Sequence, residues 1–146
     1  MTTIFMAEDD PLMSRMYERA FKASGYALEM APDGEEALLK LEKLPTPPTV
    51  MLLDVMMPKK NGFDVLREMK QNEKLKHIPV IMLTNLAGQA DAEKALSLGA
   101  VLYLVKSQYD PKEVVDKVKE ILNASSRGED VPTVAVGIKD IEVDKK

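Results

Sequence analysis

Six polar side chains of the sequence share one feature, because each stands at or close behind the end of a short apolar run. They are Glu8, Asp9, Asp10, Asp54, Thr84 and Lys106. Several carboxylates in one pocket repel one another, so a cation must be present to keep them ionised. Hard oxygen ligands favour Mg²⁺, which is usually held by one or two carboxylates together with a phosphate oxygen. The chemistry that these residues could perform together is Mg²⁺-dependent phosphoryl transfer.

Phosphoryl transfer requires an oxygen nucleophile, neutralisation of charge and donors aimed at the phosphoryl oxygens. Asp54 can supply the nucleophile and form an aspartyl-phosphate, while Asp9 and Glu8 can hold the metal. Thr84 can donate a hydroxyl hydrogen bond, and Lys106 can neutralise a phosphate oxygen as a compact positive charge. The sequence therefore offers catalytic groups and metal ligands for one reaction.

These groups can act together only if the fold brings them to one place. Five short apolar runs alternate with five longer amphipathic segments, which predicts a parallel sheet with right-handed helical crossovers. The apolar runs are Thr3–Ala7, Tyr26–Met30, Val50–Leu53, Pro79–Leu83 and Val101–Val105. We expect a doubly wound, flavodoxin-like α/β fold with the strand order 2-1-3-4-5. Sites in such sheets form at the carboxyl ends of the strands, where the six polar side chains fall.

The segments between the apolar runs carry helix start and stop signals. Asp and Asn favour the N-cap, and glycine favours the position just after a helix. The expected helices start at Asp10-Pro11, Asp33, Asn61-Gly62, Gln89 and Asp110-Pro111, and Gly25 and Gly99 end the first and the fourth. Glu36, three residues after Asp33, resembles a capping box. The fifth helix is expected to run through Leu122.

Composition argues against several other classes of protein. The chain has 146 residues, of which 45% are hydrophobic, and this suffices for one domain with a buried core. Cysteine is absent, so disulfides and zinc-thiolate sites are excluded. The net charge is −4, Lys and Arg are scattered, and no apolar run approaches the ~20 residues that span a bilayer. We expect a cytoplasmic protein without direct contact to nucleic acid or membrane.

Four stretches of the sequence together resemble the receiver domain of bacterial two-component response regulators, in that family's order and spacing. They are Phe5–Asp10, Leu52–Pro58 with Gly62, Ile81–Thr84, and Gly99-Ala100 with Tyr103–Lys106. Each stretch alone would be weak evidence. The resemblance covers residues 1 to about 124, and we expect a stand-alone receiver of the chemotaxis-regulator kind. We expect a receiver domain at 1–124 and a tail or linker at 125–146, disordered or with one added strand at Thr133–Ile138.

The resemblance implies roles for the residues that match its motifs. Asp54 matches the phosphoacceptor, and Lys106 matches the phosphate-binding lysine. Glu8 and Asp9 match the acidic pair that holds Mg²⁺, with Asp9 as the direct ligand and Glu8 acting through water. The backbone carbonyl of Met56 matches a further protein ligand of the ion.

The resemblance also implies how the domain signals. Thr84 and Tyr103 match the switch pair, in which the hydroxyl moves to the phosphate and the ring turns inward. Asp10 is expected to cap a helix rather than to bind the metal. The expected protein is a signalling phosphoacceptor and not an enzyme. It would take a phosphoryl group from a sensor histidine kinase or a phosphotransfer protein and switch a surface that binds a downstream protein.

The chain departs from the family pattern near the expected site. The lysine is usually followed by proline in a cis peptide, but here it is followed by Ser107. A cis bond before another residue costs about 3–4 kcal/mol, so we expect a trans bond and a rearranged loop. Asn85 stands where a small residue is usual and would narrow the mouth of the site. Val101 and Leu102 replace residues that are often acidic.

An apolar group lies at the start of the expected edge strand, formed by Leu98 just before it and by Val101 and Leu102 within it. If it faces solvent between the fourth and fifth helices, it forms a patch of the kind that marks interaction sites. We expect phosphorylation-dependent homodimerisation or partner docking there. The alternative is that the C-terminal tail covers Val101 and Leu102.

Two other functions fit parts of the sequence. One is the receiver half of a larger transcriptional regulator. The other is a haloacid-dehalogenase-type phosphatase, which also uses an aspartyl nucleophile with Mg²⁺, Thr or Ser, and Lys. That phosphatase needs a second carboxylate two residues after its nucleophile, and Met56 at this position cannot transfer a proton. A nucleotide-binding P-loop is excluded because its Gly-x-x-x-x-Gly-Lys-Ser/Thr motif does not occur.

Overall fold

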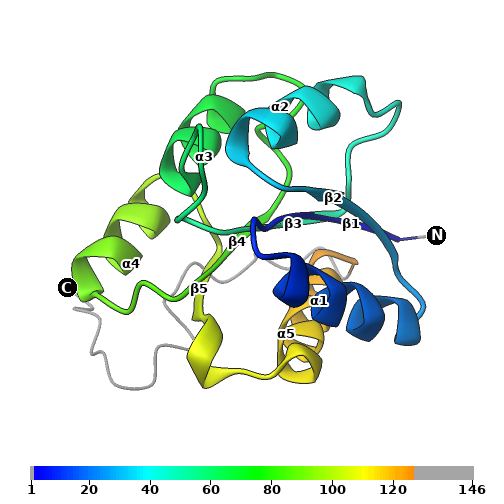
Figure 1. Cartoon of the computed structure of the whole chain (residues 1–146). Coiled ribbons are helices and arrows are strands. Elements are labelled where there is room, and N and C mark those ends of the chain that lie inside the picture. Colours follow the sequence, from blue (N-terminus) through cyan, green and yellow to red (C-terminus); the bar gives the residue numbers. More distant parts are fainter. Residues whose placement is uncertain (1, 127–146) are drawn as a thin grey trace.

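A single parallel sheet forms the centre of the molecule (Figure 1). The structure is a computed structural model that describes residues 2–126. The strand order is β2-β1-β3-β4-β5, and every pairing is parallel. The strands are β1 (Thr3–Ala7), β2 (Ala27–Ala31), β3 (Val50–Leu53), β4 (Val80–Thr84) and β5 (Leu102–Val105). The expected flavodoxin-like α/β fold and its strand order are confirmed.

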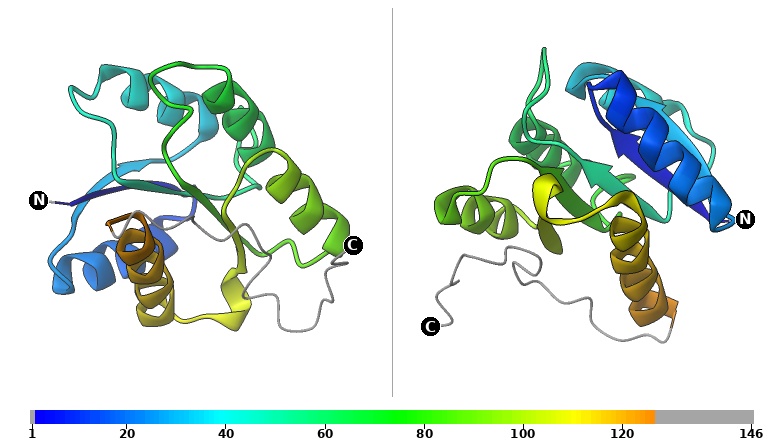
Figure 2. Two further views of the ribbon diagram at one scale, coloured as in Figure 1. Left: turned by 180° about the vertical axis from the view of Figure 1, so that it is seen from behind. Right: turned by 60° about the horizontal axis from the view of Figure 1, so that its bottom comes forward.

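Helices cover both faces of this sheet. They are α1 (Pro11–Ala23), α2 (Gly34–Lys43), α3 (Gly62–Lys70), α4 (Gln89–Ser97) and α5 (Pro111–Ser126), with a 3₁₀ turn η1 (Lys106–Gln108) after β5. Figures 1 and 2 show α1 and α5 on one face and α2, α3 and α4 on the other. Within residues 2–126, no helix is long and apolar enough to cross a membrane.

Four strands, β1, β3, β4 and β5, are largely buried because each of them packs side chains on both faces, whereas the edge strand β2 is only partly buried. In β1, Ile4 and Met6 pack with the core on the α1 and α5 side, whereas Phe5 and Ala7 pack with the core on the α2, α3 and α4 side. This alternation follows the two-residue period of a strand, and both faces are apolar because both are covered. The sheet is thus a rigid frame, and the polar residues are left to its rim.

Polar side chains cap α1, α2, α3 and α5 much as the sequence indicates, whereas α4 begins after Gly88 without a side-chain cap. The carboxylate of Asp10 accepts hydrogen bonds from two N–H groups of the first turn of α1, and Asp33 accepts one from the N–H of Glu36 at 2.8 Å. A reciprocal capping box closes the start of α5. There the N–H of Glu113 donates to Asp110 at 2.8 Å, and the N–H of Asp110 donates to Glu113 at 3.1 Å.

Some boundaries differ from those expected. β4 begins one residue late because Pro79 has no N–H to donate to the ladder, and it includes Thr84. β2 and β5 also begin one residue later than expected. α5 ends at Ser126 rather than at Leu122. The expected tail strand Thr133–Ile138 lies outside the described residues.

Candidate functional site

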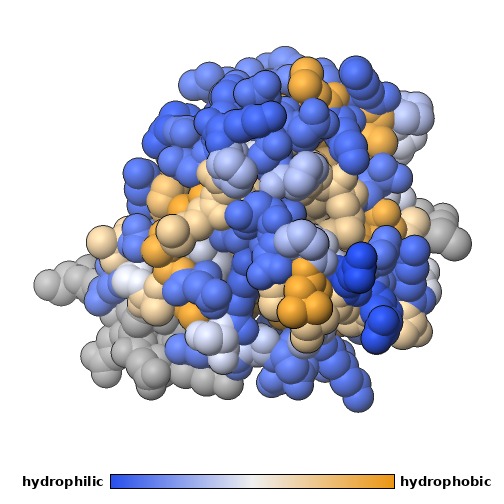
Figure 3. All heavy atoms as spheres, viewed as in Figure 1, coloured by the Kyte–Doolittle hydropathy of each residue, from blue (hydrophilic) through white to orange (hydrophobic). Residues whose placement is uncertain are grey.

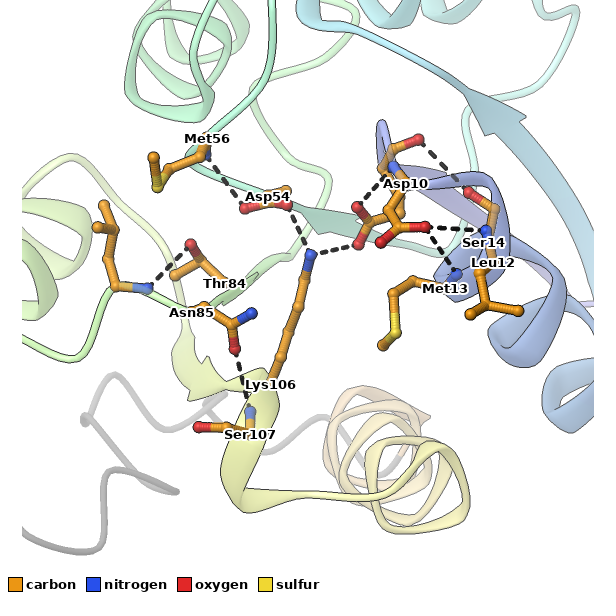
Figure 4. Close-up of polar contacts among 12 residues, drawn as sticks. Asp10, Leu12, Met13, Ser14, Asp54, Met56, Thr84, Asn85, Lys106 and Ser107 are labelled. Atoms are coloured by element: carbon orange, nitrogen blue, oxygen red, sulfur yellow. Dashed lines mark hydrogen bonds and ion pairs between the residues drawn. The ribbon is translucent and has the colours of Figure 1, made fainter.

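The carboxyl ends of four strands meet at one edge of the sheet, and the candidate residues lie there (Figure 4). In the register of β1 with β3, Glu8 and Asp54 directly follow paired residues of the two strands. In the register of β4 with β5, Thr84 lies opposite the residue before Lys106. Side chains far apart in the sequence lie close together because the paired strands end at the same position along the sheet.

Asp54 is held in one orientation by a donor on each of its carboxylate oxygens. It is only 5% exposed. Its Oδ1 accepts a hydrogen bond from the backbone N–H of Met56 at 3.1 Å, and its Oδ2 accepts one from Nζ of Lys106 at 2.7 Å. Hydrogen bonds from charged donors are the stronger kind, so the lysine contact dominates this arrangement.

Lys106 bridges two buried carboxylates. Besides Asp54, its ammonium group forms an ion pair with Oε1 of Glu8, whose other oxygen accepts a hydrogen bond from the N–H of Asp10 at 3.1 Å. Asp9 adds a third carboxylate nearby. The site therefore contains three carboxylates and one ammonium group, an excess of negative charge that favours a cation.

Burial and hydrogen bonding act in opposite directions on the pKa of each charged partner, Glu8 and Lys106. Burial dominates for Glu8, and hydrogen bonding dominates for Lys106. Burial raises the pKa of Glu8 above its usual value, and the hydrogen bond from Lys106 offsets only part of this effect. For Lys106, burial alone would lower the pKa. Its hydrogen bonds to Asp54 and Glu8 outweigh burial, so the pKa is raised. The lysine is thus a permanent positive charge at neutral pH, and it is shared between two acids.

The acidic cluster has the donor set of a hard divalent cation. Glu8, Asp9 and Asp54 each offer one carboxylate oxygen, and these oxygens all lie within 4.8 Å of one another. Glu8 and Asp54 are buried, whereas Asp9 is exposed. Oxygen donors without His or Cys suit Mg²⁺ or Mn²⁺ and not a soft metal. Asp10 does not belong to this cluster, because its carboxylate caps α1.

Thr84 and Tyr103 both form hydrogen bonds with the backbone of Leu86. Thr84 is fully buried, and its Oγ1 accepts a hydrogen bond from the N–H of Leu86 at 3.3 Å. Tyr103 lies inside the core, and its hydroxyl donates to the carbonyl of Leu86 at 2.7 Å. Burial raises the pKa of Tyr103. The sequence did not indicate this role of Leu86, because a backbone group has no signature in residue type.

Gly62 lies directly against the backbone of the candidate phosphoacceptor. A Cβ atom at this position would lie 2.3 Å from the carbonyl oxygen of Asp54, closer than atoms can approach. The N–H of Gly62 also donates to the carbonyl of Val55 at 2.9 Å. Glycine is therefore what allows α3 to begin beneath the site.

A shallow hollow of about 520 Å³ adjoins the site. It is lined by Asp9, Val55, Met56, Met57, Asn61 and Phe63. Met56 is 60% exposed, and its N–H is used by Asp54. The role of the Met56 carbonyl as a metal ligand stays a prediction. An incoming group could reach the acidic cluster from this open side.

The peptide bond after Lys106 has the geometry expected when serine replaces the usual proline. No cis peptide occurs within residues 2–126, so the bond between Lys106 and Ser107 is trans. Asn85 does more than border the mouth of the site, because its Oδ1 accepts a hydrogen bond from the N–H of Ser107 at 3.2 Å. This contact joins loops distant in sequence and could not be read from either residue alone.

The expected apolar patch beside β5 is largely covered. Leu102 is only 3% exposed and packs in the core with α1 and α5, so its expected part in a solvent-facing patch is wrong. Leu98 and Val101 are half-buried. Figure 3 shows hydrophobic groups scattered over a mostly hydrophilic face. The large hydrophobic side chains that are exposed in the described part of the chain are Leu12, Met16, Leu39 and Met56.

Comparison with known proteins gives a consistent family. Residues 4–119 match the family described as the response regulator receiver domain. The transcriptional regulatory protein CpxR of Klebsiella pneumoniae is 36% identical over 144 residues, which cover 99% of this chain and 59% of CpxR. The chain thus spans less than two thirds of the length of that curated relative.

Solved structures of receivers share the fold. The chemotaxis response regulator CheY4 of Vibrio cholerae has a TM-score of 0.75 at 27% identity, over 82% of this chain and 98% of that chain. The Mn²⁺-bound form of response regulator Rcp1 has a TM-score of 0.69 at 28% identity, over 99% of both chains. The chain with its rim of Glu8, Asp9, Asp54 and Lys106 belongs to the response regulator receiver domain family, whose members are signalling phosphoacceptors.

Proposed function

We propose that Asp54 accepts a phosphoryl group from a phosphohistidine of a sensor histidine kinase or a phosphotransfer protein. The observation that carries this proposal is the 2.7 Å contact of Lys106 Nζ with Asp54, within a cluster of three carboxylates. A nucleophilic oxygen, a fixed positive charge and ligands for a divalent cation are the parts that phosphoryl transfer requires.

The bond changes of the transfer are simple. A carboxylate oxygen of Asp54 forms a bond to phosphorus while the phosphorus–nitrogen bond of the donor breaks, and the imidazole leaves with the electron pair of that bond. Lys106 then neutralises one phosphoryl oxygen. Thr84 accepts a hydrogen bond from the N–H of Leu86, so its own hydroxyl proton is available to another phosphoryl oxygen.

We infer that Mg²⁺ is held by Glu8, Asp9, Asp54 and the backbone carbonyl of Met56. When bound, the ion supplies positive charge that offsets the negative charge of the phosphoryl group. The excess of carboxylates over ammonium groups supports this inference. The related Rcp1, whose structure is a Mn²⁺-bound form, supports a divalent ion in general.

The proposed output is a change in a protein-binding surface, through Thr84 and Tyr103. Homodimerisation beside β5, through Leu98 and Val101, is one form of this output. A second candidate is that the chain acts as the receiver part of a longer transcriptional regulator. This candidate is favoured by CpxR, a transcriptional regulatory protein of which the chain spans 59%. An immunoblot of the source cells would show a band well above 16.2 kDa in that case.

Phosphorylation is tested by intact-mass spectrometry after incubation with acetyl phosphate and Mg²⁺. We expect one added phosphoryl group on the wild type, none on Asp54→Asn, and none on either protein in EDTA, because both the nucleophile and the cation are required. Asp64→Asn removes a surface carboxylate that pairs with Arg67 and serves as the matched control. Labelling of Asp54→Asn at the wild-type rate, or full labelling in EDTA, would contradict the proposal.

A further inference from the structure

Asn85 and Ser107 join two loops at the rim of the site. Asn85 directly follows β4, and Ser107 lies in the turn η1 that directly follows β5. Thr84 and Val105 are the last paired residues of these two strands. Beyond them, Oδ1 of Asn85 accepts a hydrogen bond from the N–H of Ser107 at 3.2 Å (Figure 4). The side-chain amide thus extends the hydrogen bonding of the sheet past the end of its ladder.

The residue that this contact can control is Lys106. Lys106 and Ser107 are consecutive residues of η1, which is closed by the N–H of Tyr109 donating to the carbonyl of Lys106 at 3.3 Å. Short 3₁₀ turns have poor hydrogen-bond geometry, so an added contact matters for their orientation. The Lys106 side chain starts from this turn and must reach Asp54 and Glu8 with its ammonium group.

We propose that Asn85 is a positioning residue, which fixes the turn after β5 through the Ser107 N–H and thereby keeps the Lys106 ammonium group on Asp54. Proline at position 107 would have no N–H, and a small residue at position 85 would have no acceptor that could reach. The contact therefore requires both an acceptor side chain at position 85 and a residue other than proline at position 107. The inference rests on the proposed phosphorylation of Asp54, since positioning of Lys106 matters for that reaction.

The expected cost of losing the contact falls on reactivity and not on folding. Asn85 and Ser107 are both exposed, so water can replace the amide oxygen as acceptor for the Ser107 N–H. The turn would then sample orientations in which Lys106 is misaligned. For Asn85→Ala we expect phosphorylation by acetyl phosphate to slow roughly two- to tenfold, the rate equivalent of one hydrogen bond, at an unchanged melting temperature.

The test is a double-mutant cycle of the wild type, Asn85→Ala, Ser107→Pro and the double variant, with rates of Asp54 labelling in Mg²⁺. Because Ser107→Pro removes the donor, we expect Asn85→Ala to have no further effect in that background. An equal effect of Asn85→Ala in both backgrounds would overturn the inference, since Asn85 would then act directly at the mouth. Asn123→Ala, an exposed asparagine on α5, is the control and should match the wild type.

A second readout does not depend on phosphorylation. Exchange of the Ser107 amide hydrogen and the Nζ resonance of Lys106, both measured by NMR, should change in Asn85→Ala. Asn85→Asp retains an acceptor oxygen and should restore slow exchange at Ser107. If the wild type is not labelled at all, the proposed function fails, and the Nζ resonance still decides whether Asn85 positions Lys106. An unchanged Nζ resonance in Asn85→Ala would overturn the inference on its own.

Discussion

Lys106 places one ammonium group between two buried carboxylates, and this shortage of positive charge governs the chemistry of the site. Removing one partner of a buried ion pair is strongly destabilising, because it leaves an uncompensated charge. Here Glu8 and Asp54 share a single partner, and Asp9 adds a further negative charge. This excess of negative charge supports the proposed role of Asp54 as a nucleophile that acts together with a divalent cation.

The side chains around the mouth bear on how long a phosphoryl group would last on Asp54. Hydrolysis needs a water aligned with the phosphorus atom, and a side chain that forms a hydrogen bond can hold it. Met56 is at the mouth but cannot do so, and Leu86 packs partly against the core. The amide oxygen of Asn85 is already used by Ser107. We therefore expect a long-lived phosphorylated state.

Met56→Asn tests this expectation in a dephosphorylation time course. Because an asparagine there could orient the attacking water, we expect hydrolysis to accelerate about two- to tenfold, the equivalent of one hydrogen bond. Met56→Leu keeps the size and apolar character and should hydrolyse at the wild-type rate. Leu86→Glu is a poorer test, since a charge would enter a partly buried position. A rate unchanged or slowed by Met56→Asn would refute the expectation.

At the scale of the elements, the sequence predicted the strands, the helix starts and the edge of the sheet at which the acidic residues lie together. These features were predictable because strand periodicity and N-caps are local sequence patterns, and because sites in parallel sheets form at the carboxyl ends of the strands. The role of Leu86 and the contact between Asn85 and Ser107 depend on backbone groups brought together by the fold. No local pattern specifies them.

The inclusion of Leu102 in a solvent-facing patch was wrong for a related reason. β5 is an edge strand, and this leaves one row of backbone hydrogen-bonding groups without a neighbouring strand. An edge strand can still have both of its faces covered. Leu102 points into the core with α1 and α5, and Tyr103 points to the opposite side, so both side chains are buried.

Asp10 tests whether an acidic residue beside the cluster belongs to a helix or to the metal site. Its carboxylate accepts a hydrogen bond from the N–H of Leu12 at 2.9 Å. We expect Asp10→Ala to lower the free energy of unfolding by about 1 kcal/mol, the usual cost of a lost N-cap, while Mg²⁺ affinity changes little. Asp10→Ser keeps a capping oxygen and should restore stability. Urea unfolding and Mg²⁺ titration measure both, and a large loss of Mg²⁺ affinity in Asp10→Ser would make Asp10 a ligand.

At the scale of the whole molecule, hydrogen bonds connect the site with the edge of the sheet. Thr84 at the site and Tyr103 on β5 both bond to the backbone of Leu86. A Thr84 hydroxyl that turned toward a phosphoryl group would alter the first of these bonds. Its effect could then reach β5 and the helices beside it, α4 and α5 (Figure 1). Phosphorylation would therefore change the binding of a partner protein at a surface in this region.

Sedimentation velocity tests whether this surface forms a dimer. Because Leu102 is buried, its replacement by Asp would disturb the core, so half-buried Val101 is the better site. We expect the wild type to shift from monomer to dimer with beryllofluoride and Mg²⁺, and Val101→Asp to remain monomeric. A stable dimer buries about 800 Å² on each partner, so residues of α4 and α5 must contribute beyond Leu98 and Val101. Leu39→Asp changes an exposed side chain of α2, and this control should dimerise as the wild type does. A wild type that stays monomeric with beryllofluoride would contradict the dimer and leave docking of a different protein as the output of this face.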